Sequence, residues 1–390
     1  KGCLLLVEEF FWLFFGIIVG VFSGLVPGLH SNSVSLLLVY LFSGDSLNFA
    51  IFVVALCITH SIVEIIPSML TGAAEDSTIN LLPGQELLLS GRGFEAIYFS
   101  IVGVVCTLFV FLLPVLFSFT TYFSWIIDFF LLPIIFVVLF LLIFHEKNFF
   151  GALLVAFSSG FIGLTLINSG IKEIVFSLVT GFFAVPALFY SSKTINLPRQ
   201  KICYPDLFDF RFGALTSLLS CFLSVVPAFG PAHASSLLGV FYRKLSKTEY
   251  LLLSGGIGVS NLLFGVLVLY TLNKTRSGMT VIISSIVDLS FSDLLILLSV
   301  AFCAAGFACL ITLFIAKFVL LKIHDLNYGF LSVIILAFVF LLVFLFSGFF
   351  GLVACFIASL VGNYCLKKKV SRSLCMCFLL FPTLVFYLGF

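Results

Sequence analysis

Two stretches about 200 positions apart carry matching residues in the middle of hydrophobic segments. The first covers residues 22–38 and the second 222–238, and Phe, Val, Pro, Ser and a Leu pair coincide when the two are aligned. Proline and glycine at membrane depth leave backbone groups without helical partners, which is tolerated only where protein or a water-filled cavity surrounds them. Paired interrupted segments in the two halves of a membrane chain indicate a transporter binding site. We therefore predict a membrane transporter built from two repeats.

Composition predicts the same class of protein. Hydrophobic residues make up 62% of the chain and charged residues only 9%, with a mean hydropathy of +1.31, whereas about a quarter of a soluble domain is charged. We expect an all-α, multi-pass membrane protein, with the lipid bilayer as its main partner. The net charge of +2 gives no sign of an acidic partner, and nucleic acid is excluded.

The eleven cysteines include no C-x-x-C pair, and most of them lie inside apolar segments. In such surroundings a thiol behaves as a small hydrophobe. The pattern indicates neither a disulfide framework nor a metal site. The first apolar run lacks a small-residue cleavage site and leads into the Pro27 motif, so we expect a structural segment rather than a cleaved signal peptide.

Hydropathy divides the chain into two similar halves, because a spanning helix needs about 20 apolar residues. We place a first repeat at 1–190, a basic cytoplasmic linker at 191–211 and a second repeat at 212–390. Each repeat begins with a Pro/Gly-interrupted segment, at 10–43 and at 212–242. The predicted spans that follow are 49–70, 95–118, 122–144, 149–169 and 173–190 in the first repeat, and 249–272, 293–322, 328–346, 348–366 and 373–390 in the second.

Basic residues predict the topology, since cytoplasmic loops collect Lys and Arg. Basic clusters flank the interrupted segment on both sides, at 193–211 and 243–247. Both clusters face the cytoplasm if 212–242 enters the membrane and returns as a re-entrant hairpin. A hairpin plus five crossings makes the second repeat inverted relative to the first. Each interrupted segment is also long enough for one kinked crossing, which is the alternative.

Polar residues gather at the two interruptions. Broken hairpins expose helix N-termini whose free N–H groups attract anions, and hydroxyl and amide groups add donors without a fixed charge. The alternative is that Pro and Gly only kink a helix that Ser and Asn cap. The substrate-binding candidates are Gly24, Pro27, Gly28, His30, Ser31, Asn32 and Ser33 in the first repeat, and Pro227, Gly230, Pro231, His233, Ser235 and Asn261 in the second.

His60 and Glu64 are four residues apart and therefore share a helix face. A charged residue within a span is a functional candidate by default. Glu64 is a candidate to bind a coupling proton or sodium ion, and His60 to share the proton. The alternative is a buried structural hydrogen bond between them. No H-E-x-x-H pattern and no third ligand support a zinc site.

Charges of opposite sign occupy the polar pieces that follow the second element of each repeat. Glu75 and Asp76 lie in the first repeat and are candidates for ion coupling or for pairing across the repeat interface. Arg276, with its fork of donors, is the predicted anion clamp of the second repeat. The alternative is that these are ordinary loop charges. The neighbouring substrate-binding candidates are Asn273, Lys274, Ser277 and Gly278.

Several of these motifs together resemble the TctA-like permeases, the large membrane subunit of tripartite tricarboxylate transporters. The resemblance rests on Ile58–Ser68, Gly72–Asp76, Leu82–Gly84, Gly91–Gly93 and Asn273–Gly278 in addition to the two hairpins, and the chain is most similar to short archaeal-type relatives. It implies a secondary transporter of carboxylates in the cell membrane of a prokaryote rather than an enzyme, with no cofactor except Na⁺ or H⁺ as a coupling ion. It also implies a small accessory membrane subunit or a binding protein as partner, and a homodimer is a further possibility.

Two alternatives stay open at this point. Pro-Gly-Leu-His and Pro-Ala-Phe-Gly replace the family's usual hairpin sequences, and a related family carries polyprenyl phosphates across the bilayer. Neutral donors with one or two cations suit a lipid phosphate as well as a carboxylate. From a different class, an intramembrane enzyme would act through His60, Glu64 and Asp76.

Overall fold

The computed structural model describes residues 2–27, 35, 46–71, 82–116, scattered positions between 133 and 144, and then 146–193, 197–205, 213–218, 246–275 and 277–387. This described part is helical and contains no strand. Eight of its helices are long and apolar enough to cross a membrane. An all-α, multi-pass architecture is therefore confirmed.

The helices follow the predicted spans closely. The second repeat is described from residue 246 onwards except for a few positions, whereas the segment at 219–245 and most of 122–144 and 28–45 lie outside the described residues. In the first repeat the helices are α1 (Gly2–Leu25), α3 (Ser46–Val63), α4 (Ile65–Leu70), α5 (Pro83–Leu89), α6 (Gly93–Leu116), α8 (Phe149–Leu166), α9 (Ile174–Val179), a π-helical turn (Thr180–Ala184) and α10 (Val185–Ser191). In the second they are α13 (Lys247–Leu272), α14 (Gly278–Ile286), α15 (Phe291–Lys322), a 3₁₀ turn (Ile323–Asp325), α16 (Tyr328–Lys368), a second 3₁₀ turn (Arg372–Met376) and α17 (Cys377–Tyr387).

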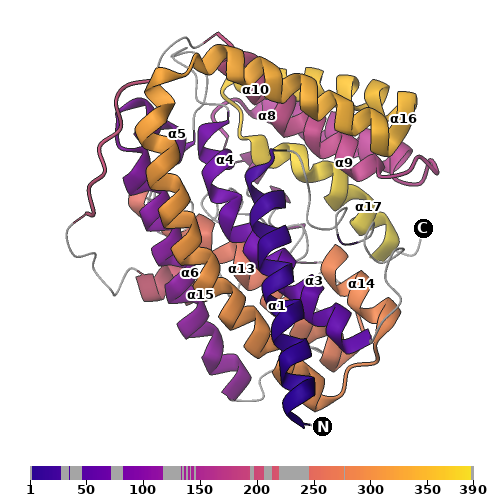
Figure 1. The fold of residues 1–390 in the computed structure, drawn as a ribbon. Coiled ribbons are helices and arrows are strands. Elements are labelled where there is room, and N and C mark those ends of the chain that lie inside the picture. The colour runs from indigo at the N-terminus through magenta and orange to yellow at the C-terminus, as the bar shows by residue number, and fades with distance from the viewer. Residues whose placement is uncertain are drawn as a thin grey trace.

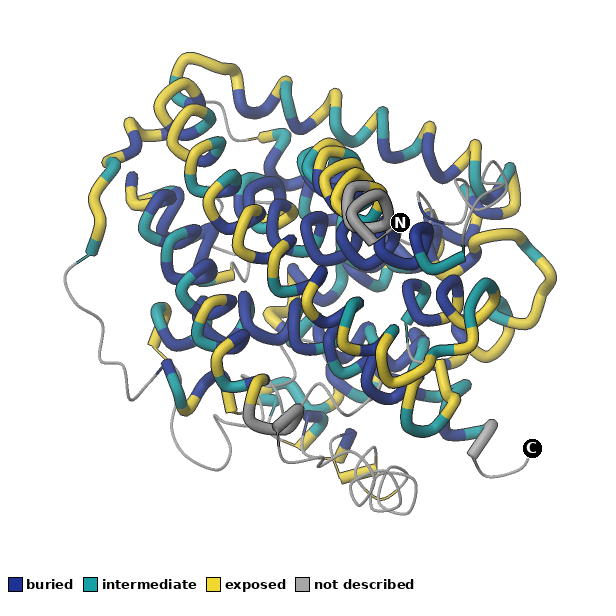
Figure 2. Tube along the Cα trace, turned by 60° about the horizontal axis from the view of Figure 1, so that its bottom comes forward, coloured by how far each residue is buried: buried dark blue, intermediate teal, exposed yellow. Residues whose placement is uncertain are grey.

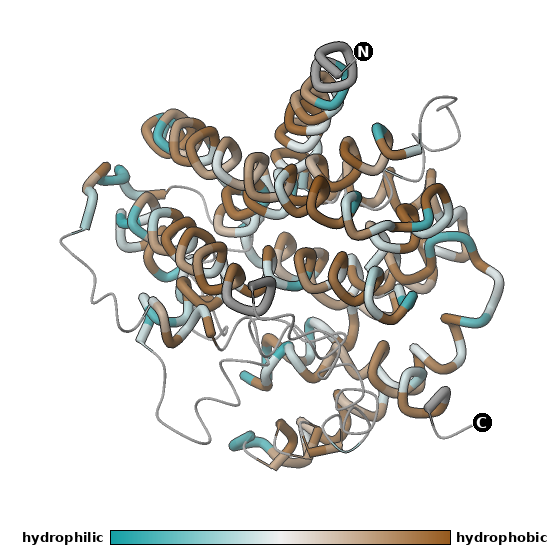
Figure 3. Tube along the Cα trace, turned by 90° about the horizontal axis from the view of Figure 1, so that it is seen from below, coloured by the Kyte–Doolittle hydropathy of each residue, from teal (hydrophilic) through white to brown (hydrophobic). Residues whose placement is uncertain are grey.

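The outer surface is apolar, as a bilayer requires. Phe150, Phe350 and Phe109 are 82%, 72% and 68% exposed, and phenylalanine recurs among the exposed large side chains. Buried turns lie in the interior and exposed ones at the periphery (Figure 2). Hydrophobic positions run along nearly all the helices, with hydrophilic ones concentrated at their ends and connections (Figure 3). Exposed phenylalanine on this scale is expected where side chains contact lipid rather than water.

The described helices form two groups around two main apolar cores, and Leu253 and Ile257 of α13 contribute to the second core as well. The first helix group consists of α1, α3, α4, α5, α6, α13, α14 and α15, and the second of α8, α9, the π-helical turn, α10, α16 and α17 with the 3₁₀ turn before it. In Figure 1, α8, α9, α10 and α16 lie together above α1, α3, α6 and α15. Each group combines helices from both halves of the chain.

Helix α16 is a hairpin rather than one long helix. Gly348 interrupts it with φ 66° and ψ −164°, a conformation that favours glycine. Ser347 Oγ donates to the carbonyl oxygen of Glu173 at 3.1 Å, and Ser191 Oγ donates to Ser332 Oγ at 3.0 Å. The segment α9–α10 therefore runs antiparallel to the first arm. The two arms correspond to the predicted spans 328–346 and 348–366.

Close packing aligns α1 with α3. A Cβ on Gly16 would lie 2.6 Å from the carbonyl oxygen of Phe52, and one on Gly20 would lie 2.8 Å from that of Leu56. Gly24 meets the carbonyl oxygen of His60 in the same way, at 2.9 Å. Small residues at four-residue spacing let helix backbones approach in membranes. Because α1 and α3 run parallel, the chain leaves α1 at one end of the pair and enters α3 at the other.

The long helices of the first helix group run in two directions. Helix α15 packs along α3 and ends beside the end of α4, where the Tyr328 hydroxyl donates to the carbonyl oxygen of Leu70. Helix α6 begins at the same end of the group, since a Cβ on Gly93 would lie 3.3 Å from Leu320. Therefore α15 is parallel to α3, and α6 is antiparallel to both.

Helix α13 is parallel to α6. At their beginnings, Lys247 Nζ lies 2.8 Å from Glu86 Oε2 of α5, which immediately precedes α6. Near their ends, the rings of Phe111 and Phe264 pack edge to face with centroids 5.0 Å apart. Helices α3 and α13, which occupy equivalent positions in the two halves, therefore run in opposite directions.

Proline breaks the hydrogen-bond ladder of α9–α10. Pro186 has no N–H to donate to the carbonyl oxygen of Phe182 four residues earlier, and the preceding turn, Thr180–Ala184, is π-helical. A Cβ on Gly362 would lie in close contact with this same carbonyl oxygen. The second arm of α16 thus packs directly against the broken turn.

The same arrangement recurs in α17. Pro382 lies inside this helix and leaves the carbonyl oxygen of Phe378 without its helical donor. Here the close neighbour is Gly163 of α8, whose Cβ would collide with that carbonyl oxygen. The rings of Phe182 and Phe378 lie 5.4 Å apart. Two Phe-x-x-x-Pro helices, one from each half, are each packed against a glycine from the other half.

We predict that filling either glycine position destabilises the protein. Gly163→Ala and Gly362→Ala should each lower the free energy of unfolding by about 1–3 kcal/mol, because the added methyl collides with backbone rather than with a flexible side chain. The measurement is the melting temperature of purified protein in detergent. Gly306→Ala is the control, since nothing lies within 4 Å of the new methyl, and it should gain about 0.5–1 kcal/mol from helix propensity. Equal melting temperatures for all three variants would contradict the packing described.

Candidate functional site

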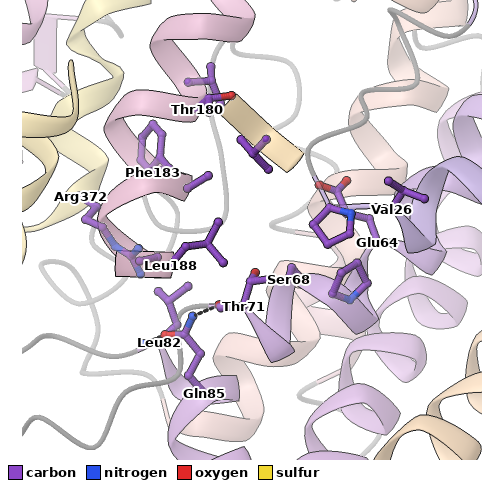
Figure 4. Close-up of a pocket in the computed structure, with 16 residues that line it drawn as sticks. Val26, Glu64, Ser68, Thr71, Leu82, Gln85, Thr180, Phe183, Leu188 and Arg372 are labelled. Atoms are coloured by element: carbon purple, nitrogen blue, oxygen red, sulfur yellow. Dashed lines mark hydrogen bonds between the residues drawn. The ribbon is translucent and has the colours of Figure 1, made fainter. Parts of the chain in front are cut away.

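A cavity of about 230 Å³ lies between the two helix groups (Figure 4). One wall comes from the end of α1, the α3–α4 junction and the start of α5, and the other from α9–α10, α16 and the turn before α17. Its polar lining consists of Glu64, Ser68, Thr71, Gln85, Thr180 and Arg372.

The break between α3 and α4 positions Glu64 in the wall. Pro67 lacks the N–H that would pair with the carbonyl oxygen of Val63, and α3 ends at that residue. Glu64 sits between the two helices with φ −57° and ψ −18°, so the chain continues with little change of direction. Its side chain is 50% exposed and faces the cavity (Figure 4). An acidic side chain is therefore accessible in an otherwise apolar segment.

His60 connects Glu64 to the interior. Its ring is 3% exposed, Nδ1 lies 3.0 Å from Ser23 Oγ, and Nε2 lies 3.6 Å from Glu64 Oε2. The Ser23 hydroxyl also reaches the carbonyl oxygen of Gly20 at 3.2 Å. When Nδ1 carries no proton, Ser23 donates to it; when Nδ1 is protonated, Nδ1–H donates to Ser23, which donates to the carbonyl oxygen of Gly20. The arrangement accepts a proton on His60 without losing a hydrogen bond at Nδ1.

The opposite wall contains the π-helical turn. Thr180 begins this turn, and Phe183, Ala187 and Leu188 line the cavity on the same side. Single π-turns are frequent at functional sites, and here the cause is the N–H that Pro186 lacks. Both walls of the cavity therefore contain a proline-broken helix.

Gln85 closes the cavity between the end of α4 and the start of α5. Its Nε2 donates to the carbonyl oxygen of Thr71 at 2.8 Å, and its Oε1 accepts from the backbone N–H of Leu82 at 3.2 Å. Figure 4 shows this side chain on the lower wall. Its donor and acceptor are both engaged, so it shapes the wall rather than offering a free polar group.

Arg372 supplies the positive charge of the cavity. It begins the 3₁₀ turn between α16 and α17, and the preceding residue, Ser371, is held by a 2.9 Å hydrogen bond from its N–H to Glu146 Oε1. Figure 4 shows Arg372 and Glu64 on opposite sides of the cavity. The guanidinium is partly buried, and no hydrogen bond or ion pair to it is found in the described part of the chain.

The structure brings some predicted site residues together and separates others. Pro27 and Glu64 line the same cavity, and His60 contacts Glu64 as the i, i+4 spacing predicts. Gly24 lies in the α1–α3 contact instead. Asn261 lies within α13 and does not line the cavity. The same holds for the candidates at the connection of α13 and α14 and at the start of α14: Asn273, Lys274, Ser277 and Gly278. The remaining candidates lie outside the described residues: Gly28, His30, Ser31, Asn32, Ser33, Glu75, Asp76, Pro227, Gly230, Pro231, His233, Ser235 and Arg276.

Helix capping explains two residues at the α13–α14 connection. Asn273 ends α13 in the left-handed region at φ 52°, a conformation that asparagine adopts more readily than most residues. Ser277 begins α14, and its Oγ accepts from the N–H of Thr280 at 3.3 Å. Lys274 is exposed. Asn273 and Ser277 therefore cap helices, and none of the three residues lines the cavity.

Sequence reasoning missed Gln85, Thr180 and Arg372. Gln85 and Thr180 carry no charge and belong to ordinary apolar helices. Arg372 follows three consecutive lysines and reads as part of a cytoplasmic basic cluster. Its direct neighbours in the sequence are Ser371 and Ser373, so no local pattern singles it out, and a single turn is too short to give a face by periodicity.

Helices of this length and apolarity, an outer surface of exposed phenylalanine and a polar cavity between two helix groups define a multi-pass α-helical membrane protein. The chain matches the Tripartite tricarboxylate transporter TctA family over residues 10–377, and it belongs to that family. It is therefore a transporter of the cell membrane, of the tricarboxylate type that the family name describes.

Other comparisons add little about function. The chain is 28% identical over 399 residues to an uncharacterized protein of Methanocaldococcus jannaschii, an archaeon, and the match covers 97% of this chain and 98% of that relative. This agrees with the predicted similarity to short archaeal-type members. No solved structure matches the chain.

We predict that the Ser23 hydroxyl stabilises His60. Ser23→Ala should lower the free energy of unfolding by about 1–3 kcal/mol, because a buried ring nitrogen loses its partner. Ser284→Ala is the matched control, since that hydroxyl is exposed and bonds only within its own helix; it should change stability by less than about 0.5 kcal/mol. Melting temperatures in detergent measure both. A loss no larger for Ser23→Ala than for the control would show that the Ser23–His60 contact carries no net stability.

Proposed function

We propose that this protein is an ion-coupled secondary transporter that moves a small anionic substrate of the carboxylate class by alternating access. The observation that carries the proposal is the cavity between the two helix groups, with Glu64 exposed at a helix break on one wall. Transporter sites typically lie at the interface of repeats and are formed by discontinuous helices. Membership of the TctA family supports the carboxylate class.

Inverted repeats are the proposed architecture. The opposite directions of α3 and α13 support it, as do the two Phe-x-x-x-Pro helices, each packed on a glycine from the other half. The parallel alignment of α1 and α3 supports a re-entrant hairpin in the first repeat, because Gly24 near the end of α1 lies beside His60 near the end of α3. Alternating access then consists of one helix group rocking against the other around the cavity.

Glu64 is the proposed coupling residue. An ionised carboxylate in a small cavity repels an anionic substrate, and this repulsion is stronger in a partly apolar site than in water. Binding of H⁺ or Na⁺ at Glu64 removes the repulsion, so the coupling ion and the substrate each increase the affinity for the other by the same factor. His60 lies 3.6 Å from Glu64 and keeps its hydrogen bond to Ser23 whether the ring is neutral or protonated.

Cavity size favours a small substrate over a lipid phosphate. A volume of about 230 Å³ is below the roughly 300–1,000 Å³ typical of pockets for drug-sized ligands. A di- or tricarboxylate suits such a volume, whereas a polyprenyl phosphate would need room for its chain as well. The polyprenyl-phosphate translocase is therefore the second candidate.

Partner subunits are also proposed. The family name describes tripartite transporters, in which the large membrane protein works with other subunits. By that relationship, this chain would work with a small membrane subunit and a substrate-binding protein.

Coupled uptake into proteoliposomes tests the proposal. Purified protein should accumulate a labelled tricarboxylate when an inward H⁺ or Na⁺ gradient is imposed. Glu64→Gln should lower gradient-driven uptake at least tenfold, because the amide binds neither ion. It should retain exchange of labelled for unlabelled substrate, since a neutral side chain mimics the ion-bound state.

Glu86→Gln is the control variant for this assay. Glu86 forms a half-exposed ion pair with Lys247, which contributes at most about 1 kcal/mol, so uptake should stay near that of the unmodified protein. Gradient-driven uptake by Glu64→Gln equal to that of Glu86→Gln would refute the role of Glu64. Uptake of no carboxylate under any gradient would refute the proposed function itself.

A further inference from the structure

We propose that Arg372 is the cationic ligand of the transported anion, and that its guanidinium binds an oxyanion of the substrate inside the cavity between the helix groups. This inference rests on the proposed function and identifies the residue that gives the site its charge selectivity.

The position of Arg372 supports this assignment. Its side chain lines the cavity together with Glu64, Gln85 and Thr180, although it belongs to a turn that joins two apolar helices. The turn is held from behind, because Ser371 N–H donates to Glu146 at 2.9 Å and Ser371 Oγ accepts from the N–H of Ser373 at 3.3 Å. The backbone is anchored, and the guanidinium points to the cavity.

No acidic side chain among the described residues pairs with the guanidinium of Arg372. Glu146, which precedes α8 in the chain, accepts a hydrogen bond from the backbone N–H of Ser371, and no ion pair between it and Arg372 is found among the described residues. Glu64, the acidic residue of the cavity, lies on the far side and contacts His60. Among the described residues the guanidinium of Arg372 has no hydrogen-bonding or ion-pairing partner. A partly buried cation without a partner is destabilising, and it is kept where something else completes it.

The chemistry of a guanidinium indicates which kind of ligand pairs with Arg372. A guanidinium presents five donors in a planar fork and pairs with both oxygens of a carboxylate or phosphate. Glu64 across the cavity then suits the coupling cation, so the two charged ligands bind at separate walls of one space (Figure 4). The ligand is an oxyanion, and under the proposed function it is a carboxylate.

A structural role predicts the opposite effect on stability. If Arg372 existed to hold the fold, its removal would lower the melting temperature. If it binds a ligand instead, Arg372→Met should raise the melting temperature of the ligand-free protein, because a charge without a partner among the described residues is replaced by an apolar side chain of similar length. Ligand-dependent stabilisation should disappear at the same time.

The experiment measures melting temperatures of four purified proteins in detergent with citrate, succinate, inorganic phosphate or a short-chain polyprenyl phosphate. The unmodified protein and Lys368→Met should be stabilised by citrate. Lys368 is exposed, lies four positions from Arg372 and loses the same charge. Arg372→Met should lose the stabilisation, and Arg372→Lys should bind at least tenfold more weakly, because an ammonium cannot pair bidentately.

A second measurement on the unmodified protein covers the case in which a variant does not fold. Phenylglyoxal modifies accessible arginine, and peptide mass spectrometry reports each site. Saturating citrate should protect Arg372 and leave Arg92, which pairs with Glu95 at the surface, unprotected. Equal modification of Arg372 with and without ligand would overturn the inference.

The outcomes separate this inference from the proposed function. Citrate stabilisation that persists in Arg372→Met overturns the role of Arg372 and leaves the carboxylate transporter standing. Stabilisation by inorganic or polyprenyl phosphate alone, lost in Arg372→Met, supports Arg372 as the oxyanion ligand and contradicts the carboxylate class. Binding of none of the four anions by the unmodified protein overturns both.

Discussion

The structure depends on how broken backbone hydrogen bonds are accommodated in an apolar environment. Pro67, Pro186 and Pro382 each remove one N–H from a helix, and a carbonyl group left exposed to lipid would be costly. At Pro186 and Pro382 the freed carbonyl is covered by a helix that approaches at a glycine. The break at Pro67 borders the cavity, and so does the break at Pro186 on another side of its helix. The same residues that weaken individual helices thus determine where helices pack most closely and where the site lies.

Electrostatics gives the cavity its polarity. Two charged side chains face it from opposite walls, Glu64 with a histidine neighbour and Arg372 with no partner in the described chain. Their separation matters, because an ion pair between them would neutralise both and leave nothing for a ligand to complete. Held apart, each remains available for a species of opposite charge. Under the proposed function, a cavity with this arrangement would favour a cation and an anion together over either alone, as coupled transport requires.

The sequence predicted the class, most spans and part of the site. Hydropathy located the helices because a bilayer imposes a minimum length, and the i, i+4 spacing of His60 and Glu64 follows from helix geometry alone. Arg372 was not predicted, since it follows shortly after three exposed lysines at 367–369 in the sequence, whereas the other side chains that line the cavity come from distant helices. The glycine contacts were missed for the same reason: Gly163 and Gly362 lie in apolar stretches that give no sign of which carbonyl group they meet. Sequence periodicity describes a helix by itself, whereas a cavity is defined by the surfaces of several.

The distribution of close contacts bears on how such a molecule moves. The glycines of α1 that meet α3 lie within the first helix group, and Gly163 and Gly362 lie within the second. Contacts between a glycine and a neighbouring backbone resist sliding, because the surfaces interlock without flexible side chains between them. The cavity, in contrast, lies between the groups and is bordered by broken helices. The proposed alternating access needs two rigid parts and a yielding interface, and in this structure these glycine contacts lie inside each part whereas the cavity lies where the parts meet.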